Sequence, residues 1–309
     1  MIQELLSAGE NLPRISIHEP IVTFLVVNKI KELPNLSIQS ALANTSASIV
    51  VGYLSDEDIV DIQPHPRLYR LKLKIDEDSS QNTNTGYSDF GKLEFFYLVT
   101  FKWILLQKLF GLGFKILIYS DLDIAWFKDA VAEITLLFND SPNVHVAIQS
   151  ATFIPSQPRL CMGFAAFRRS EEVDELIRVC HLNHLNAVKN SQMIGDDDVV
   201  TTYYTSDPKP NWILELPQVS FPVGILMNAF VRNRTIPGLN LPLPFIFHAN
   251  YVVGERNKRL LMQYAMHRIF LESKFGTFSL EMRIFLFLKR LRFLASVIKK
   301  ALIVARFKR

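Results

Sequence analysis

Residues 114–129 read FKILIYSDLDIAWFKD, a run in which an apolar segment leads into two closely spaced carboxylates. Its apolar first part, residues 114–119, predicts a buried β-strand that leads directly to Asp121 and Asp123. In an open α/β sheet ligands bind where the strands end, and two carboxylates spaced i, i+2 there can reach one divalent cation. A solvated acidic turn is the alternative. The apolar flanks favour the cation site, because carboxylates in such surroundings are costly unless positive charge compensates them.

Strands and helices alternate on both sides of this stretch. Short, apolar, β-rich runs predict strands, and longer segments with helical periodicity predict helices. The alternation implies an α/β fold whose sheet is largely parallel and covered by helices on both faces. The predicted strands are residues 20–28, 47–53, 70–75, 114–119, 143–149, 163–167 and 245–248, and the predicted helices are 29–44, 92–110 and 171–189. The polar segment 76–91 predicts a loop.

The composition is that of a soluble globular enzyme, with 49% hydrophobic and 21% charged residues among 309. Cys161 and Cys180 are the only cysteines in the sequence, so no disulfide framework is indicated and a reducing compartment is expected. Residues 1–20 lack the apolar run of a secretory signal, and no stretch approaches the roughly 20 apolar residues of a transmembrane helix. We therefore expect a cytoplasmic protein, or one on the cytosolic face of a membrane.

Positive charge is concentrated near the C-terminal end of the chain. Residues 281–309 contain nine basic residues and one acidic residue, a balance of +8, so residues 1–280 contribute −4 to the net charge of +4. This is not the pattern of a nucleic-acid binder, whose basic surface usually belongs to the fold. We interpret residues 1–275 as the catalytic domain and 276–309 as a basic, hydrophobic, helical tail that attaches to an anionic membrane surface. The alternatives for the tail are a helix packed on the catalytic domain and an oligomer interface.

Residues 119–129, YSDLDIAWFKD, resemble the signature of the nucleotide-diphospho-sugar transferase family, which includes plant and protist α-xylosyl- and α-galactosyltransferases. Further segments agree in their order, so that the similarity spans about residues 20–260: Lys102 ahead of the strand, CMGF at 161–164, GDDD at 195–198 and HANY at 248–251. The resemblance implies a GT-A type fold, in which a single Rossmann-like mixed sheet has helices on both faces. The nucleotide-binding half would be about 20–125 and the acceptor half about 126–260.

The activity that the resemblance implies is transfer of a hexosyl or pentosyl group from a nucleotide-sugar to an acceptor hydroxyl, with retention of anomeric configuration. UDP is the expected nucleotide, and a glycan, a lipid or a protein is the expected acceptor. No nucleic acid is expected as a partner.

The resemblance also implies a metal and a set of donor contacts. In structurally related enzymes such as glycogenin, a late histidine is the third protein ligand to Mn²⁺, and a lysine that follows a glycine contacts the donor diphosphate. His248, Gly254 and Lys258 are similar, so Asp121, Asp123 and His248 would hold Mn²⁺ or Mg²⁺. A buried core histidine is the alternative for His248, and an exposed helical lysine for Lys102. The expected contacts to the nucleotide-sugar are Asn28, Lys102, Asp121, Leu122, Gly163, Gly254 and Lys258.

The acidic segment Asp196, Asp197 and Asp198 is similar to an Asp-Gln-Asp segment that binds the transferred sugar beside its anomeric carbon in the glycogenin-like relatives. By that resemblance these residues are the candidate catalytic group, and Asp197 replaces the glutamine. Asp197 would stabilise an oxocarbenium-like state or act as a nucleophile, and the sequence leaves both roles open. An exposed acidic helix start is the alternative. Cys161 stands where the family usually has a polar residue, and a buried structural thiol is expected there.

Two further functions remain as alternatives. A phosphohydrolase of the haloacid dehalogenase type also places Asp-x-Asp after an apolar strand, but there that segment usually begins the domain. Such an enzyme would leave His248 and Lys258 without a role. The second alternative is a non-catalytic, membrane-attached protein that binds a nucleotide-sugar on a degenerate transferase fold, which Asp197 and Cys161 would favour.

Overall fold

The computed structural model describes residues 15–27, 30, 33–74, 91–152, 157–206, 209–224, 243–250 and 254–273. The chain divides into two compact units, Met1–Met262 and Gln263–Arg309. The strands described below all belong to the first unit. Asn28 and the tail at 276–309, for both of which the sequence makes predictions, lie outside the described residues. Within the described part of the chain, no helix combines the length and the apolarity needed to cross a membrane.

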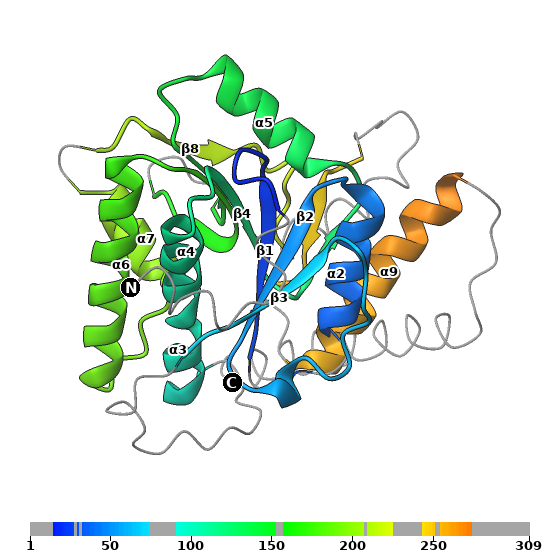
Figure 1. Ribbon diagram of the computed structural model, residues 1–309, viewed down its shortest axis with the longest axis horizontal. Coiled ribbons are helices and arrows are strands. Elements are labelled where there is room, and N and C mark those ends of the chain that lie inside the picture. Colours follow the sequence, from blue (N-terminus) through cyan, green and yellow to red (C-terminus); the bar gives the residue numbers. More distant parts are fainter. Residues whose placement is uncertain are drawn as a thin grey trace, which may run out of the picture. The chain divides into compact units, whose positions relative to one another are not determined.

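A seven-stranded sheet forms the centre of the first unit (Figure 1). Its strands lie in the order β3-β2-β1-β4-β7-β6-β8. β7 runs antiparallel to both of its neighbours, and the other neighbouring pairs are parallel. The predicted mixed α/β sheet is therefore confirmed. The strands are β1 (Ile21–Val26), β2 (Ser48–Tyr53), β3 (Leu68–Lys72), β4 (Ile116–Ser120), β6 (Val146–Ser150), β7 (Leu160–Arg168) and β8 (Ile213–Leu216).

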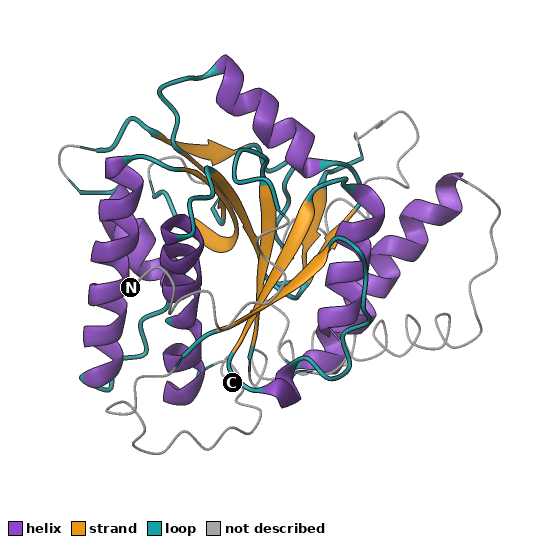
Figure 2. Ribbon diagram, viewed as in Figure 1, coloured by secondary structure: helices purple, strands orange, loops and turns teal. Residues whose placement is uncertain are grey.

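Helices cover both faces of this sheet (Figure 2). Because both faces of the sheet are covered, β1 is buried along its whole length. A strand covered on both faces is expected to be a nearly continuous apolar run, as IVTFLV is. α2 (Leu33–Asn44) lies on one side, and α3 (Leu93–Val99), α4 (Phe101–Gly111), α6 (Glu171–Lys189) and α7 (Asp196–Tyr204) lie on the other. The remaining helices in the described residues are the 3₁₀ helix η3 (Asp56–Asp58), α5 (Ala130–Asp140) and α9 (Glu255–Ser273).

Two predicted helices show how closely the local sequence sets the boundaries. The helix predicted at 171–189 is α6, which begins after Ser170, whose Oγ accepts a hydrogen bond from the Val173 N–H. The single helix predicted at 92–110 is instead two helices, α3 and α4, that meet at Thr100. There the Thr100 N–H donates to Tyr97 O at 3.0 Å, the tighter i to i−3 pattern, and the hydroxyl of Thr100 donates to the same carbonyl.

A second, two-stranded sheet pairs β5 (Ile124–Trp126) with β9 (Ile246–His248) in antiparallel register. The strand predicted at 245–248 is thus confirmed, whereas its partner at 124–126 was not predicted. Three residues are too few for a periodic pattern to be recognised. This small sheet matters for function because both of its strands adjoin candidate metal ligands.

Candidate active site

The Asp-x-Asp segment lies at the end of a strand, as predicted. Asp121 follows β4 directly, and its N–H donates to Gly163 O of the neighbouring strand β7 at 2.7 Å. Asp123 precedes β5, and the pairing of β5 with β9 sets Ile124 opposite His248. The Ala249 N–H then donates to Asp123 O at 2.8 Å. Through these backbone contacts the small sheet brings a histidine from late in the chain to the Asp-x-Asp turn.

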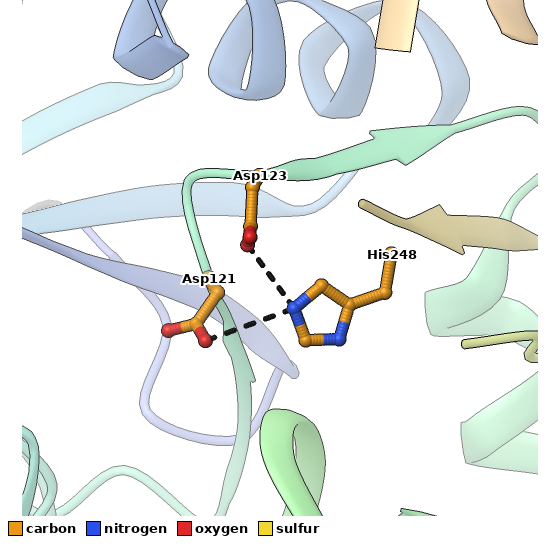
Figure 3. Close-up of side chains that lie close together, drawn as sticks. All are labelled: Asp121, Asp123 and His248. Carbon is orange, nitrogen blue, oxygen red and sulfur yellow. Dashed lines mark ion pairs between the residues drawn. The ribbon is translucent and has the colours of Figure 1, made fainter. Parts of the chain in front are cut away.

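Asp121, Asp123 and His248 form a compact group of metal-ligand type, with one ligand atom from each within 4.8 Å of the others. His248 Nε2 is 3.1 Å from Asp123 Oδ1 and 3.9 Å from Asp121 Oδ2. Figure 3 shows the ring turned so that this nitrogen points toward both carboxylates. Carboxylate oxygens together with an imidazole nitrogen are ligands that suit Mn²⁺, and carboxylates also bind Mg²⁺. The residues therefore fit the divalent cation that the sequence predicts.

Gly163 makes room for the imidazole of His248. A Cβ at position 163 would lie 2.0 Å from His248 Cε1, far inside any permitted contact, so only glycine lets the ring lie against β7. The sequence predicts Gly163 as a contact of the nucleotide-sugar. In the structure its immediate neighbour is the proposed metal ligand, and a contact with the donor stays a prediction.

The other ring nitrogen of His248 is also engaged. Nδ1 lies 3.0 Å from Gln149 Oε1 and 3.6 Å from Cys161 Sγ. Gln149 and His248 are both buried, and Cys161 is the buried thiol that the sequence predicts. Burial raises the pKa of the Cys161 thiol well above its usual value, and the Asp197 carboxylate raises it further, so the thiol stays protonated.

Lys102 is buried at the centre of the site rather than exposed on its helix. Its Nζ is 2.9 Å from Asp121 Oδ1 and 2.5 Å from Asp196 Oδ2, and it lies over the ring of Tyr119. Burial lowers the pKa of Lys102, but the carboxylates of Asp121 and Asp196 outweigh burial and hold that pKa well above its usual value. Lys102 is therefore a permanent cation that links the Asp-x-Asp turn to α7.

Lys258, from the first turn of α9, pairs with the other carboxylate of the turn. Its Nζ is 2.6 Å from Asp123 Oδ2. Burial raises the pKa of Asp123, yet the Lys258 ammonium and then the His248 imidazole outweigh burial and hold that pKa well below its ordinary value. Gly254, one residue ahead of α9, has φ +90, a conformation that favours glycine. Gly254 and Lys258 thus belong to the same turn beside the candidate metal ligands.

The three aspartates at the start of α7 point to different partners, which reduces their mutual repulsion. Asp196 pairs with Lys102. Asp197 Oδ1 accepts a hydrogen bond from the Met162 N–H at 2.6 Å. Asp198 Oδ2 accepts from the Gly195 N–H at 3.0 Å, and half of its side chain is exposed. The alternative of an exposed acidic helix start therefore describes Asp198, which caps the helix, but not Asp196 or Asp197.

The acidity of Asp197 is strongly perturbed. Burial and then the neighbouring Asp196 carboxylate raise the pKa of Asp197 to about 7, against the opposing charge of Lys102. In contrast, the pKa of Asp196 is lowered, because the nearby Lys102 outweighs burial. Neighbouring carboxyl groups whose pKa values are shifted in opposite directions are characteristic of catalytic sites.

Polar side chains of α2 bond to the backbone of β5, directly after the Asp-x-Asp turn. Ser37 Oγ donates to Ile124 O at 2.6 Å, and Ser40 Oγ accepts from the Trp126 N–H at 3.1 Å. Asn44 Nδ2 donates to Trp126 O at 3.0 Å. These bonds satisfy the backbone N–H and C=O groups of β5 that do not pair with β9.

Two residues that contact the candidate ligands were not predicted as part of the site. Tyr119 donates its hydroxyl hydrogen to Asp121 Oδ1 at 3.0 Å, and Gln149 meets His248. Alternation along β4 could have indicated Tyr119, since residues two apart share a face. Gln149 is a polar residue directly after the apolar run Val146, Ala147 and Ile148, which is the signal that could have indicated it. Leu122 is largely buried, and its predicted contact with the donor stays a prediction.

Comparisons with known proteins agree with this geometry. Residues 60–262, more than half of the chain, match the model of a family described as nucleotide-diphospho-sugar transferase. The matched segment contains all three candidate metal ligands, the aspartates of α7 and Lys258. A search of curated proteins finds no match.

Proposed function

The chain belongs to the nucleotide-diphospho-sugar transferase family, and we propose that it is a retaining glycosyltransferase that depends on Mn²⁺ or Mg²⁺. Membership implies a nucleotide-sugar donor and an acceptor, and the mostly parallel seven-stranded sheet is consistent with a GT-A-like fold. The observation that supports the metal dependence is the convergence of Asp121, Asp123 and His248 on one point. We propose a UDP-sugar as donor, with a hexosyl or pentosyl group as the part transferred.

Charge stabilisation at the leaving group is the main catalytic effect that we propose. Asp121, Asp123 and His248 would hold a divalent cation, and that cation would supply positive charge to the departing nucleoside diphosphate. Lys258 adds a fixed ammonium beside the same carboxylates, 2.6 Å from Asp123. We propose that Lys258 and Lys102 contact the donor phosphates, with Leu122, Gly163 and Gly254 as neighbouring contacts and Asn28, outside the described residues, as a nucleotide contact. Lys102 in addition holds Asp121 and Asp196 in place.

The aspartates of α7 are proposed to face the transferred sugar. Lys102 joins Asp196 to Asp121, so the start of α7 lies within one side chain of the proposed cation. Asp197, next in sequence, has a pKa of about 7, raised by burial first, and a backbone hydrogen bond that fixes its carboxyl. For a retaining transfer the acceptor attacks on the face from which the diphosphate departs. Asp197 would then stabilise the oxocarbenium-like state or act transiently as a nucleophile, and Asp198 would serve to cap the helix.

Transfer assays with purified protein test the proposal. The substrates are a panel of UDP- and GDP-sugars with and without Mn²⁺, and the readouts are nucleotide release and labelled sugar on glycan, lipid or peptide acceptors. We expect Asp121→Asn and Asp123→Asn to lose about 10²–10³-fold in turnover, the loss typical of removing a preorganised charge-stabilising group. Asp140→Asn, at the exposed end of α5, is the matched control and keeps full activity. Full Mn²⁺-dependent activity in the Asp121 and Asp123 variants would rule out the proposed site.

The family match bears differently on the two alternative functions. The phosphohydrolase alternative loses its support, because the family match names a different reaction and β1, β2 and β3 precede the Asp-x-Asp turn. The non-catalytic protein remains an outcome of the assays. Mn²⁺-dependent binding of a nucleotide-sugar, without hydrolysis or transfer to any acceptor, would establish it.

For residues 276–309 we propose reversible attachment to the cytosolic face of a membrane, with residues 1–275 as the catalytic domain. The proposal rests on sequence alone, where nine basic residues alternate with apolar runs between 281 and 309. Each basic residue near an anionic leaflet contributes about 1 kcal/mol. Co-sedimentation with phosphatidylserine vesicles should separate the full chain, which pellets, from a chain ending at Thr277, which does not. Equal behaviour of the two would show that the tail is no membrane anchor.

A further inference from the structure

We infer that Gln149 is the positioning residue that sets the tautomer of His248 and thereby aims Nε2 of the ring at the proposed cation. The inference rests on the proposed function, because it concerns the same metal site. Gln149 lies in β6, has no exposed surface, and places its Oε1 3.0 Å from His248 Nδ1. It comes from the central sheet, whereas His248 comes from the small one.

The orientation of the Gln149 amide is fixed by its other end. Its Nε2 donates to Phe221 O at 2.9 Å and to Pro222 O at 3.0 Å. If the amide were flipped, its oxygen would lie against these two carbonyl oxygens, and neither pair could form a hydrogen bond. The group that faces His248 is therefore Oε1, which can only accept. A hydrogen bond to it requires that Nδ1 carries the hydrogen.

Cys161 offers the opposite tautomer, and the geometry disfavours it. Its Sγ lies 3.6 Å from His248 Nδ1, so the thiol would have to donate to a bare nitrogen. In that case Gln149 Oε1 and Nδ1 would be two acceptors 3.0 Å apart. A thiol is a weak donor, and Asn250 Nδ2 already donates to the same sulfur at 3.6 Å. The Gln149 contact therefore decides where the hydrogen lies.

The consequence concerns the side of the ring that faces the carboxylates. With the hydrogen held on Nδ1, Nε2 is the ring nitrogen left to face the Asp123 carboxylate, 3.1 Å from Oδ1. The ring then stands between two acceptors, the Gln149 carbonyl and the Asp123 carboxylate, so a proton or a cation must lie between Nε2 and Asp123 Oδ1. At the proposed site a divalent cation would take the Nε2 lone pair. Groups that bond the remote nitrogen of a metal-binding histidine commonly change metal affinity by about 10–100-fold.

The first test needs no variant of Gln149. Nitrogen-15 NMR of histidine-labelled wild-type protein reports which ring nitrogens carry hydrogen, and the His248 signals are assigned by their loss in His248→Gln. We expect Nδ1 to be protonated without added metal and to remain so with saturating Mg²⁺, which leaves Nε2 without hydrogen. An Nδ1 without hydrogen in the wild-type protein would overturn the inference, whether or not the metal binds.

The second test compares two neighbours of the same nitrogen. Mn²⁺ binding without donor, followed by electron paramagnetic resonance, should weaken by about 10–100-fold in Gln149→Met. It should stay unchanged in Cys161→Ala, which removes the thiol and keeps the amide. Wild-type affinity in a folded Gln149→Met protein would refute the role of Gln149 and leave the metal site standing. If the wild-type protein binds no Mn²⁺, the proposed metal dependence fails, and the NMR measurement still decides the tautomer.

Discussion

A methyl group at position 163 would collide with the imidazole of His248, because a Cβ there would lie 2.0 Å from Cε1. We expect Gly163→Ala to displace the ring, to cost about 1–3 kcal/mol of stability as overpacking does, and to abolish most Mn²⁺ binding. Thermal unfolding and Mn²⁺ titration measure the two effects. Gly111→Ala is the control, since nothing lies within 4 Å of an added Cβ at that helical position. Normal Mn²⁺ affinity in Gly163→Ala would show that the ring is not a ligand.

We expect the stability of the protein to depend on pH through Asp197. Burial first, then the Asp196 carboxylate, raises its pKa from 3.8 to about 7. The folded chain therefore binds the Asp197 proton more tightly than the unfolded chain does. The protonated carboxyl stabilises the fold fully below the ordinary pKa of 3.8, and this contribution is lost as pH rises through about 7. Asp197→Asn lacks this dependence and keeps an acceptor for the Met162 N–H. Relative to wild type, its free energy of unfolding in urea should increase as pH rises across this window and then level off. A difference that is constant with pH would contradict the raised pKa.

Among the elements, α2 bonds by its side chains to backbone groups of β5 that point away from β9, and Ser37 also reaches the Asp121 carbonyl of the Asp-x-Asp turn at 3.3 Å. Ser37 donates to Ile124 O at 2.6 Å, and both groups are buried. Ser37→Ala leaves that carbonyl unsatisfied, so we expect a loss of about 1–3 kcal/mol in stability and weaker Mn²⁺ binding. Gln39→Ala, at a partly exposed position of the same helix, is the control. Unchanged Mn²⁺ affinity in Ser37→Ala would mean that the turn keeps its shape without α2.

The elements also show which parts of the fold the sequence predicts and why. β1 and β4 are apolar except for Thr23 and Ser120, and α6 has an amphipathic pattern over 19 residues, so the sequence predicts all three. β5 has only three residues, and its conformation depends on β9 and α2, which are distant in sequence. Asp121, Asp123 and His248 could be predicted by resemblance to a family. The contacts of Gln149 and Tyr119 depend on tertiary packing, which no local pattern reports.

Across the molecule, the charged groups and the imidazole of the site come from segments far apart in the sequence, between Lys102 and Lys258. Its carboxylates come from the β4–β5 turn and from α7, its cations from α4 and α9, and its imidazole from β9. Lys102 and Lys258 each pair with a carboxylate of the Asp-x-Asp turn at 2.9 and 2.6 Å. These aspartates therefore have positive partners within the protein besides any bound cation, and the fold does not depend on the metal for their charge balance.

Removing divalent cations should accordingly stop transfer without unfolding the protein, unlike in small domains whose folding energy comes from a structural metal. In differential scanning fluorimetry, we expect EDTA to leave Tm within about 2 °C of its value in buffer, because less than about 1 kcal/mol of stability is at stake.

Mn²⁺ with the correct UDP-sugar at a hundredfold excess over Kd should add about 2.7 kcal/mol to the free energy of unfolding by mass action. For a protein of this size that is a rise in Tm of about 5–10 °C. Asp121→Asn should lose most of this rise, and Asp140→Asn should keep it. A large fall of Tm in EDTA would show that the cation is structural. A rise of Tm with UDP-sugar in the absence of metal would show that donor binding does not depend on the group formed by Asp121, Asp123 and His248.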